Sequence, residues 1–404
     1  MVFLSFSSVQ KKELAIVLDI GSGSVGAAIV ALEKKQYPKI LYVTRENIAY
    51  YQHLGFKRFL GAMLHALETA TTRLHREAFE HSNLSGIRAR DVEHIHCMLA
   101  SPWYTSTTKI LCYEKDMPFL VTNVLVNNLV EQSLLTSQER KLHENQTNEP
   151  KTIETKIIQI LLNGYETAKP YEQNASHIEV ALFTSAVAQE IGSRIQSIVR
   201  KTWLNKKISF HSFALASFTV TRDLFPKNDN FMLIDVTGEV TDIFFSKNGV
   251  LVETCSTPYG KNSMLRDTAR TLQTTPEEAL SRLRQHISKK TTPEASLAIE
   301  AAIEAAGKQW VAYFEKILSY VLEAESIPRQ VYMMADPDVG ELFASWVHKE
   351  NVGRKTLGSQ GYSVTHLTPQ VLGEHVRFVR VEEPDFFVGI ESIYLAVLHA
   401  LFKT

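Results

Sequence analysis

Short apolar runs that end at a turn signal recur along this chain. Residues 14–18, LAIVL, have the length and composition of a buried strand, and Asp19 follows directly. Three glycines come next at the G-x-G-x-x-G spacing: Gly21, Gly23 and Gly26. A second apolar run, residues 25–32, lacks an N-cap signature with a charged outer face, so it is as compatible with a strand as with a helix.

This glycine segment has three interpretations when it is taken alone. A dinucleotide loop needs strand, glycine turn and helix, so that the helix N-terminus faces a pyrophosphate. A strand–turn–strand hairpin can instead hold phosphate oxygens with its turn amides and with Ser22 and Ser24, while Asp19 reaches a magnesium ion through water. A plain β-hairpin uses the same glycines only for their backbone freedom.

The same design recurs at residues 231–250, FMLIDVTGEVTDIFFSKNGV. An apolar run ends at Asp235, a turn contains Gly238, and a hydrophobic strand follows. That strand leads into a second hairpin, because Asn248 and Gly249 between apolar runs are a strong hairpin signal. If the second copy opens a hairpin, we expect the first to do so too. The repeat indicates two similar lobes with a phosphate between their turns, and it argues against a dinucleotide-binding sheet.

Four segments together resemble the actin-like ATPase superfamily, and within it the FtsA and PilM group of bacterial scaffolds for cell division and type IV pilus assembly. They are LDIGSGSV (18–25), LIDVTGEVTDI (233–243), STPYGKNSMLRDTARTL (256–272) and PDFFVGIESIYLAVL (384–398). The resemblance implies an α/β protein with a two-lobed actin-like fold, that is, a duplicated ribonuclease-H-like fold. It also implies a small inserted β-β-α-β-β-α subdomain.

The middle of the chain supplies the predicted insert. Apolar runs typical of strands flank a helical segment at residues 122–141, for which Thr122 is the predicted N-cap. The expected division is a first lobe at 1–90 that resumes at 203–228 and 380–404, an insert at 91–202, and a second lobe at 229–379.

The resemblance also implies a site for ATP and Mg²⁺ between the lobes. Asp19 and Asp235 would be the metal-binding and catalytic carboxylates, positioning magnesium-bound water. The remaining predicted nucleotide-binding residues are Gly21, Ser22, Gly23, Ser24, Thr237, Gly238, Thr241, Gly260 and Asp336. Gly260 is expected near the nucleoside.

Two motifs depart from the family pattern. The second turn usually carries three glycines and then threonines, whereas Thr237, Glu239 and Val240 replace the first glycine, the third glycine and the first threonine. A carboxylate about 4 Å from a phosphate charge costs about 4 kcal/mol at an effective dielectric of about 20. Glu239 therefore either points away from the phosphate or weakens its site. In the adenosine motif, Ala335 and Asp336 stand where glycines are expected.

Composition excludes several other classes of protein. The 404 residues carry a formal net charge of −1, so nothing draws the chain toward nucleic acid. The three cysteines are scattered, which argues against a disulfide framework or a structural zinc site. His94 and His96 suit strand packing better than metal binding, because no third ligand follows at a sensible interval. We find neither a signal peptide nor a transmembrane segment and expect a cytoplasmic protein.

The leading functional hypothesis is a nucleotide-binding scaffold at the cytoplasmic face of the inner membrane, with at most weak ATPase activity. It would recruit division or pilus proteins, and it could self-associate. The chain ends directly after its last apolar segment, without the linker and amphipathic helix typical of FtsA, which favours the PilM type. The alternatives are a nucleotide-free interaction module and a small-molecule kinase, although no catalytic Asp for a kinase can be placed.

Overall fold

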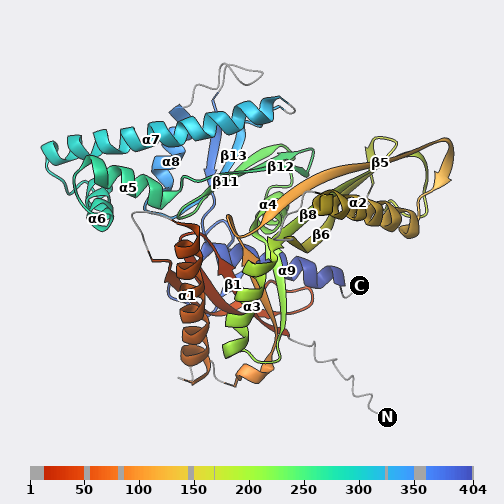
Figure 1. Ribbon diagram of the computed structural model, residues 1–404, viewed down its shortest axis with the longest axis horizontal. Helices are drawn as coiled ribbons and strands as arrows, with labels where there is room; N and C mark the ends of the chain where they lie inside the picture. The colour runs from red at the N-terminus through yellow and green to blue at the C-terminus, as the bar shows by residue number, and fades with distance from the viewer. Residues whose placement is uncertain are drawn as a thin grey trace, which may run out of the picture.

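The computed structural model describes residues 13–49, 55–80, 86–143, 150–167, 169–323, 326–349 and 361–402. Its first sheet has the strand order β15-β3-β2-β1-β4-β9 (Figure 1). These strands are β1 (Glu13–Ile20), β2 (Ser24–Leu32), β3 (Lys39–Asn47), β4 (Val92–Leu99), β9 (Lys207–Ser212) and β15 (Arg377–Phe378). The first three form an antiparallel meander, and β4 and β9 continue the sheet in parallel from β1.

The second sheet repeats this topology in the order β12-β11-β10-β13-β14. Its strands are β10 (Phe231–Val236), β11 (Thr241–Lys247), β12 (Val250–Thr257), β13 (Gln330–Ala335) and β14 (Ser363–His366). Again an antiparallel meander is followed by two parallel strands. The predicted duplicated, two-lobed α/β fold is therefore confirmed.

Both glycine segments form antiparallel hairpins, as the repeat predicted. β1 pairs with β2, and β10 pairs with β11, so neither turn leads into a helix. Asn248 and Gly249 have positive φ angles of 50° and 73° at the β11–β12 turn, the conformation that an Asn-Gly hairpin requires. The central strands β1 and β10 are almost entirely buried, because each has a strand on both sides and helices pack on the sheets.

Helices cover both sheets. The first lobe carries α1 (Phe56–His75), α3 (Gln189–Thr202), α4 (Phe213–Leu224) and α9 (Phe386–Phe402), with a π-helical turn at Arg76–Glu80 and a 3₁₀ turn at Ala89–Asp91. The second lobe carries α5 (Lys261–Thr271), α6 (Pro276–Ile287), α7 (Pro293–Leu322) and α8 (Gly340–Lys349). α4 contacts α9 as well as β11 and β12, so it connects the two lobes.

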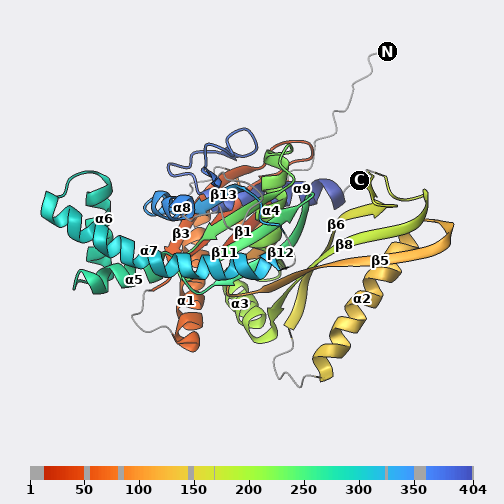
Figure 2. The same ribbon diagram turned by 90° about the horizontal axis from the view of Figure 1, so that it is seen from above.

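The insert projects from one end of the molecule, opposite α6 (Figures 1 and 2). It consists of β5 (Thr105–Leu120), α2 (Asn123–His143), β6 (Pro150–Leu162), β7 (Tyr165–Glu166) and β8 (Asn174–Ala188), with the sheet order β5-β8-β6-β7. It has a small core of its own that includes Val126 and Ile178. The predicted N-cap is confirmed, since Thr122 Oγ1 accepts a hydrogen bond from the Leu125 amide at 3.2 Å.

The structure corrects the predicted domain boundaries. The insert covers residues 105–188, not 91–202, because β4 pairs with β1 in the first sheet and α3 packs on α1. The predicted β-β-α-β-β-α segments occur in that order along the chain, with the short β7 added, but the first strand and the last helix belong to the first lobe and not to the insert. The second lobe also ends before residue 379, because β15 pairs with β3.

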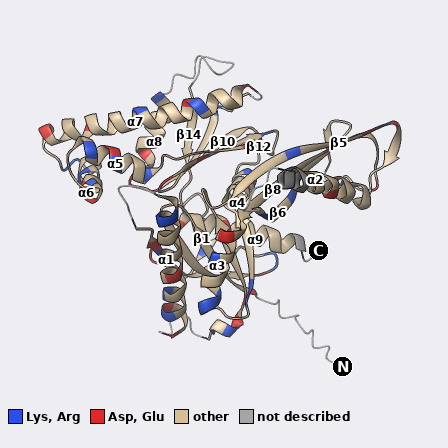
Figure 3. Ribbon diagram, viewed as in Figure 1, with Lys and Arg blue, Asp and Glu red and all other residues tan. Residues whose placement is uncertain are grey.

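Charged residues of both signs are interspersed over both lobes (Figure 3), in keeping with the net charge of −1. Among the helices of the described residues, none is both long enough and apolar enough to cross a membrane.

Candidate functional site

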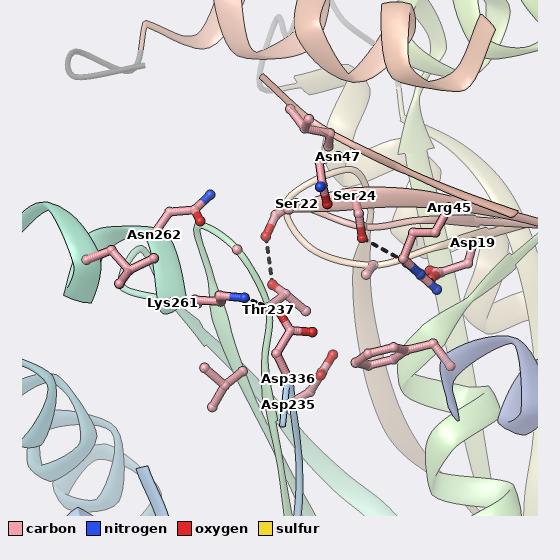
Figure 4. A pocket seen from close by; sticks show the side chains of 18 of the residues that line it. Asp19, Ser22, Ser24, Arg45, Asn47, Asp235, Thr237, Lys261, Asn262 and Asp336 are labelled. Carbon is pink, nitrogen blue, oxygen red and sulfur yellow. Dashed lines mark hydrogen bonds and ion pairs between the residues drawn. The ribbon is translucent and has the colours of Figure 1, made fainter. Parts of the chain in front are cut away.

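The tips of the two hairpins touch each other. A Cβ placed on Gly23 would lie 2.9 Å from the Cα of Gly238, and one placed on Gly238 would overlap the Gly23 backbone. The Ser22 and Thr237 hydroxyl oxygens are 2.7 Å apart (Figure 4). Thr237 donates its own proton to the Val240 carbonyl, so Ser22 donates to Thr237, and Ser22 accepts from the Glu239 amide at 2.9 Å. The two turns are therefore in direct contact, through their glycine backbones and through hydrogen bonds of Ser22.

A cleft of about 410 Å³ opens beside this contact, between the hairpins, α5 and α6. Both strand-end carboxylates lie on it. The predicted residues that line it are Asp19, Gly21, Ser22, Gly23, Ser24, Asp235, Thr237, Gly238 and Asp336. The fold thus brings residues from distant parts of the chain to a single cavity.

Two predicted residues do not line this cleft. Thr241 is fully buried, where it donates to the Tyr259 carbonyl at 2.7 Å and accepts from Trp310 Nε1. Gly260 is the N-cap of α5, and a Cβ there would clash with the backbone of Thr237 and Gly238. Thr241 thus lies in the core, and Gly260 allows α5 to pack on the second turn.

Asp19 is held by an arginine that sequence analysis did not identify. Arg45, on β3, donates from Nη2 to Asp19 Oδ2 at 2.7 Å and from Nη1 to Ser24 Oγ at 2.8 Å (Figure 4). It also binds Asp385, just before α9, through Nε at 2.7 Å and Nη2 at 2.9 Å. Burial raises the pKa of Asp19, and the charge of Arg45 counteracts this.

Asp235 has no such partner. Its side chain is fully buried, and neither carboxyl oxygen has a hydrogen-bond partner within the described residues. Burial raises the pKa of Asp235 well above its usual value, and the negative charges of Asp242, Asp19 and Asp336 add to the shift. This cleft carboxyl therefore favours the neutral form.

Glu239 points away from the cleft. Its carboxylate pairs with Arg266 of α5, whose Nη1 lies 3.0 Å from Oε1, and it accepts from Asn262 Nδ2 at 3.0 Å. Of the two outcomes that the sequence left open, the structure shows the one in which this carboxylate does not face a phosphate in the cleft.

Asp336, from the degraded adenosine motif, forms an ion pair with Lys261 on the wall of the cleft. Lys261, the first residue of α5, lies 2.7 Å from Asp336 (Figure 4). It also lies 3.6 Å from Asp338, which pairs with Arg284 of α6 at 2.7 Å. The Asp336 side chain is 49% exposed, so its pair with Lys261 is partly solvated. Lys261 and Arg284 both line the cleft.

The donors of this cleft suit a phosphate group, since lysine, arginine and amide groups lie along one wall. The contact between Gly23 and Gly238 leaves no space for a phosphate between the two tips in this conformation. The predicted Mg²⁺ site fits poorly, because Arg45 already engages Asp19. Within the described residues, no group of three or more His, Cys, Asp or Glu side chains is suited to a metal ion.

We compared the chain with known proteins. No protein-family model and no curated protein matches it. Among solved structures, one titled as a PilM-PilN type IV pilus biogenesis complex matches with a TM-score of 0.61 at 13% identity, over 96% of this chain and 98% of that one. The chain has the actin-like ATPase fold.

Weaker matches agree in coverage but carry no further argument. A Bacteroides thetaiotaomicron protein of actin-like ATPase fold and unknown function has a TM-score of 0.39 at 8% identity, over 98% of this chain and 99% of that one. The ethanolamine utilization protein EutJ from Carboxydothermus hydrogenoformans has a TM-score of 0.42 at 9% identity, over 96% of this chain and 89% of that one. At these identities the comparisons establish the fold alone.

The histidine pair of β4 lies outside this cleft, where the insert meets the first lobe. His94 and His96 have ring centroids 5.1 Å apart, and His96 Nδ1 lies 3.1 Å from His211 Nε2. His211 in turn contacts Glu154 of the insert at 3.1 Å, and Tyr394 of α9 donates to the same carboxylate at 2.7 Å. The pair belongs to a polar network that joins the insert to the first lobe.

Sequence analysis missed Arg45, Lys261 and Arg284 as cleft residues. A signal existed for Lys261, which directly follows a glycine at the predicted start of a helix. Arg45 gave no local signal, because its partners Asp19 and Asp385 are remote from it in sequence.

Proposed function

We propose that this protein is a scaffold of actin-like fold that binds a nucleotide in its interlobe cleft and recruits partner proteins at the cytoplasmic face of the inner membrane. The observation that carries the proposal is the meeting of two equivalent glycine hairpins, one from each lobe, at one cleft of about 410 Å³. Turn amides and side-chain donors arranged in this way form a general anion-binding concavity.

Lys261 is the cation best placed to receive a nucleotide phosphate. It lies on the cleft, and its partner Asp336 is half exposed. A phosphate can therefore replace a solvated carboxylate at Lys261 at low cost, because an exposed ion pair contributes little. The unpartnered carboxyl of Asp235 offers a further polar contact in the same cleft.

Nucleotide binding would couple to the arrangement of the lobes. The two tips touch, so a phosphate chain that enters between them must separate Ser22 from Thr237. Small displacements at such a contact become rigid-body movements of packed lobes. In this proposal, ligand binding changes the surface that the lobes and the insert present to a partner.

We assign the scaffold to type IV pilus assembly ahead of cell division. Support comes from the likeness to the structure titled as a PilM-PilN complex, which extends over nearly the whole of both chains. A partner protein would supply the attachment to the membrane. ATP is the proposed nucleotide, with hydrolysis at most weak.

The test is calorimetric titration and thermal shift with ATP, ADP and NAD, each against a ligand-free sample. We expect ATP or ADP to raise the melting temperature and NAD to leave it unchanged. Lys261→Ala should weaken binding by about tenfold or more, because a hydrogen bond to a charged group contributes about 1.5–3 kcal/mol. Lys308→Ala, at an exposed position on α7, is the matched control and should bind as the wild type does.

A second candidate is a nucleotide-free interaction module. It is favoured by the closed contact between the tips and by the internal pairing of Arg45, Lys261 and Arg284. The same titrations distinguish the two candidates. If millimolar ATP produces no binding heat and no shift in melting temperature, the nucleotide-binding scaffold is rejected in favour of this module.

A further inference from the structure

One row of residues crosses the first three strands of the meander. Asp19 of β1 is opposite Gly26 of β2, and Gly26 is opposite Arg45 of β3. Side chains in such a row project from the same face of the sheet. Because the middle position is a glycine, the outer two side chains can meet over it.

Gly26 leaves the space that Arg45 fills. A Cβ on Gly26 would lie 2.8 Å from Arg45 Nη2 and 3.3 Å from the Cβ of Asp19. The third glycine of the G-x-G-x-x-G motif therefore has a steric role, because its lack of a side chain lets the Arg45 side chain cross β2 and reach Asp19. This explains the spacing without a dinucleotide.

The guanidinium is fixed from several sides. It contacts Asp19, Ser24 and Asp385, with N–O distances of 2.7 to 2.9 Å. Its central carbon also lies 5.6 Å from the ring centre of Phe387. The planar, permanently charged guanidinium can hydrogen-bond Asp19 and Asp385 at the same time in a fixed geometry, which the single ammonium group of a lysine could not do.

We infer that Arg45 is the built-in counter-ion of Asp19, in the place where the actin-like fold would lead one to expect a divalent cation, so that binding in this cleft does not require a metal. The part about ligand binding rests on the proposed function. Mg²⁺ demands close octahedral oxygen coordination and keeps several waters. Arg45 Nη2 already binds Oδ2 of Asp19 at 2.7 Å, and the positive charge of the guanidinium repels a divalent cation at this carboxylate.

The first test uses the metal alone and needs no nucleotide. Mn²⁺ is titrated into the wild-type protein and into Asp19→Asn, and bound Mn²⁺ is measured by electron paramagnetic resonance. We expect the two proteins to bind Mn²⁺ equally. Wild-type binding that Asp19→Asn weakens by about tenfold or more would overturn the inference.

Removal of the guanidinium should create the missing metal site. Arg45→Ala leaves Asp19 and Asp385 without their shared counter-ion, and we expect Mn²⁺ affinity to rise by about tenfold or more. Gly26→Ala is the second variant, for use if Arg45→Ala does not fold, because its methyl group displaces only the tip of Arg45 from Asp19. Arg194→Ala, an exposed arginine on α3, is the control. No gain in the folded variants would also overturn the inference.

The second test compares nucleotide affinity in Mg²⁺ and in EDTA by calorimetry. We expect the two values to agree within about twofold, and a loss of about tenfold or more in EDTA would overturn the inference. If ATP and ADP bind in neither buffer, the proposed function fails instead, and the Mn²⁺ titrations still decide the role of Arg45.

Discussion

The two hairpins share one topology but treat their strand-end carboxylates in opposite ways. Asp19 lies in a row with Arg45 and carries an ion pair. Asp235 is fully buried and has no hydrogen-bond partner in the part of the chain that the structure describes, and its pKa is raised well above its usual value. Duplication has kept the backbone and the position of the acid in both lobes. It has not kept the counter-charge, so the chemistry of one turn cannot be inferred from the other.

The turns differ in a second respect. The second turn carries an acid of its own, Glu239, and α5 supplies Arg266 and Asn262 to hold it outside the cleft. The first turn carries only small residues there. The two tips therefore meet through glycine backbones and hydroxyl groups, while Glu239 is paired within its own lobe.

The largest expected effect comes from separating the tips. Gly238→Ala places a methyl group on the Gly23 backbone, which belongs to the other lobe and cannot rotate away. We expect a loss of about 3 kcal/mol or more in the free energy of unfolding, measured by urea denaturation. Gly23→Ala should cost less, because its closest approach is 2.9 Å.

The control for this pair is Gly61→Ala. Gly61 lies in α1 with nothing within 4 Å of an added Cβ, so the substitution should stabilise the protein by about 0.5–1 kcal/mol. Equal stability of Gly238→Ala and the wild type would mean that the tips do not touch in solution.

The next effect isolates the acid of the second turn. Arg266→Met leaves Glu239, only 6% exposed, without its main counter-charge, and we expect a loss of about 2–3 kcal/mol. Adding Glu239→Gln should recover much of this loss, because the buried charge is then gone. The exposed pair of Arg282 and Glu278 is the comparison, and Arg282→Met should cost less than about 1 kcal/mol. A double variant as unstable as Arg266→Met would contradict this account.

A smaller effect depends on pH and distinguishes Asp235 from Asp19. A carboxyl with a raised pKa in the folded state favours folding below its unfolded pKa of about 3.9, and this contribution is lost as the pH rises to the folded pKa. Asp235→Asn should therefore stabilise the protein, and by more at pH 8 than at pH 5. Denaturation curves at both pH values measure the difference.

Asp223→Asn, at a half-exposed position, is the control and should shift neither curve by more than about 0.5 kcal/mol. A loss of stability in Asp235→Asn that is equal at both pH values would mean that the ionised carboxylate has a partner in solution.

Local patterns predicted the hairpins well and sheet membership poorly. The apolar runs before Asp19 and Asp235 are strands, and the Asn-Gly turn is where its dipeptide placed it. β4 was assigned to the insert because a buried strand has the same pattern in any sheet. Its residues pair in parallel with residues of β1 that lie almost eighty positions earlier in the chain, and no local signal encodes such a contact.

The candidate site was predicted in outline, without its counter-ions. Asp19 and Asp235 do line one cleft, but Thr241 lies in the core, where its hydroxyl bonds to the Tyr259 carbonyl and to Trp310. Arg45 reaches Asp19 only through the register of three strands and the absence of a side chain at Gly26. Such a contact follows from the assembled sheet and cannot be predicted from spacing.

The smallest expected effect concerns the hydroxyl bridge between the turns. Ser22→Ala removes the donor to Thr237 and the acceptor of the Glu239 amide, and we expect a loss of about 1–2 kcal/mol. Thr237→Val should cost about 1 kcal/mol, and Thr237→Ser, which keeps the hydroxyl, about zero. The double variant Ser22→Ala with Thr237→Val should lose about 0.5–1 kcal/mol less than the sum of the two single losses, because the two residues share one hydrogen bond. Strict additivity would show that Ser22 and Thr237 do not contact each other and that the two tips are joined through glycine backbone alone.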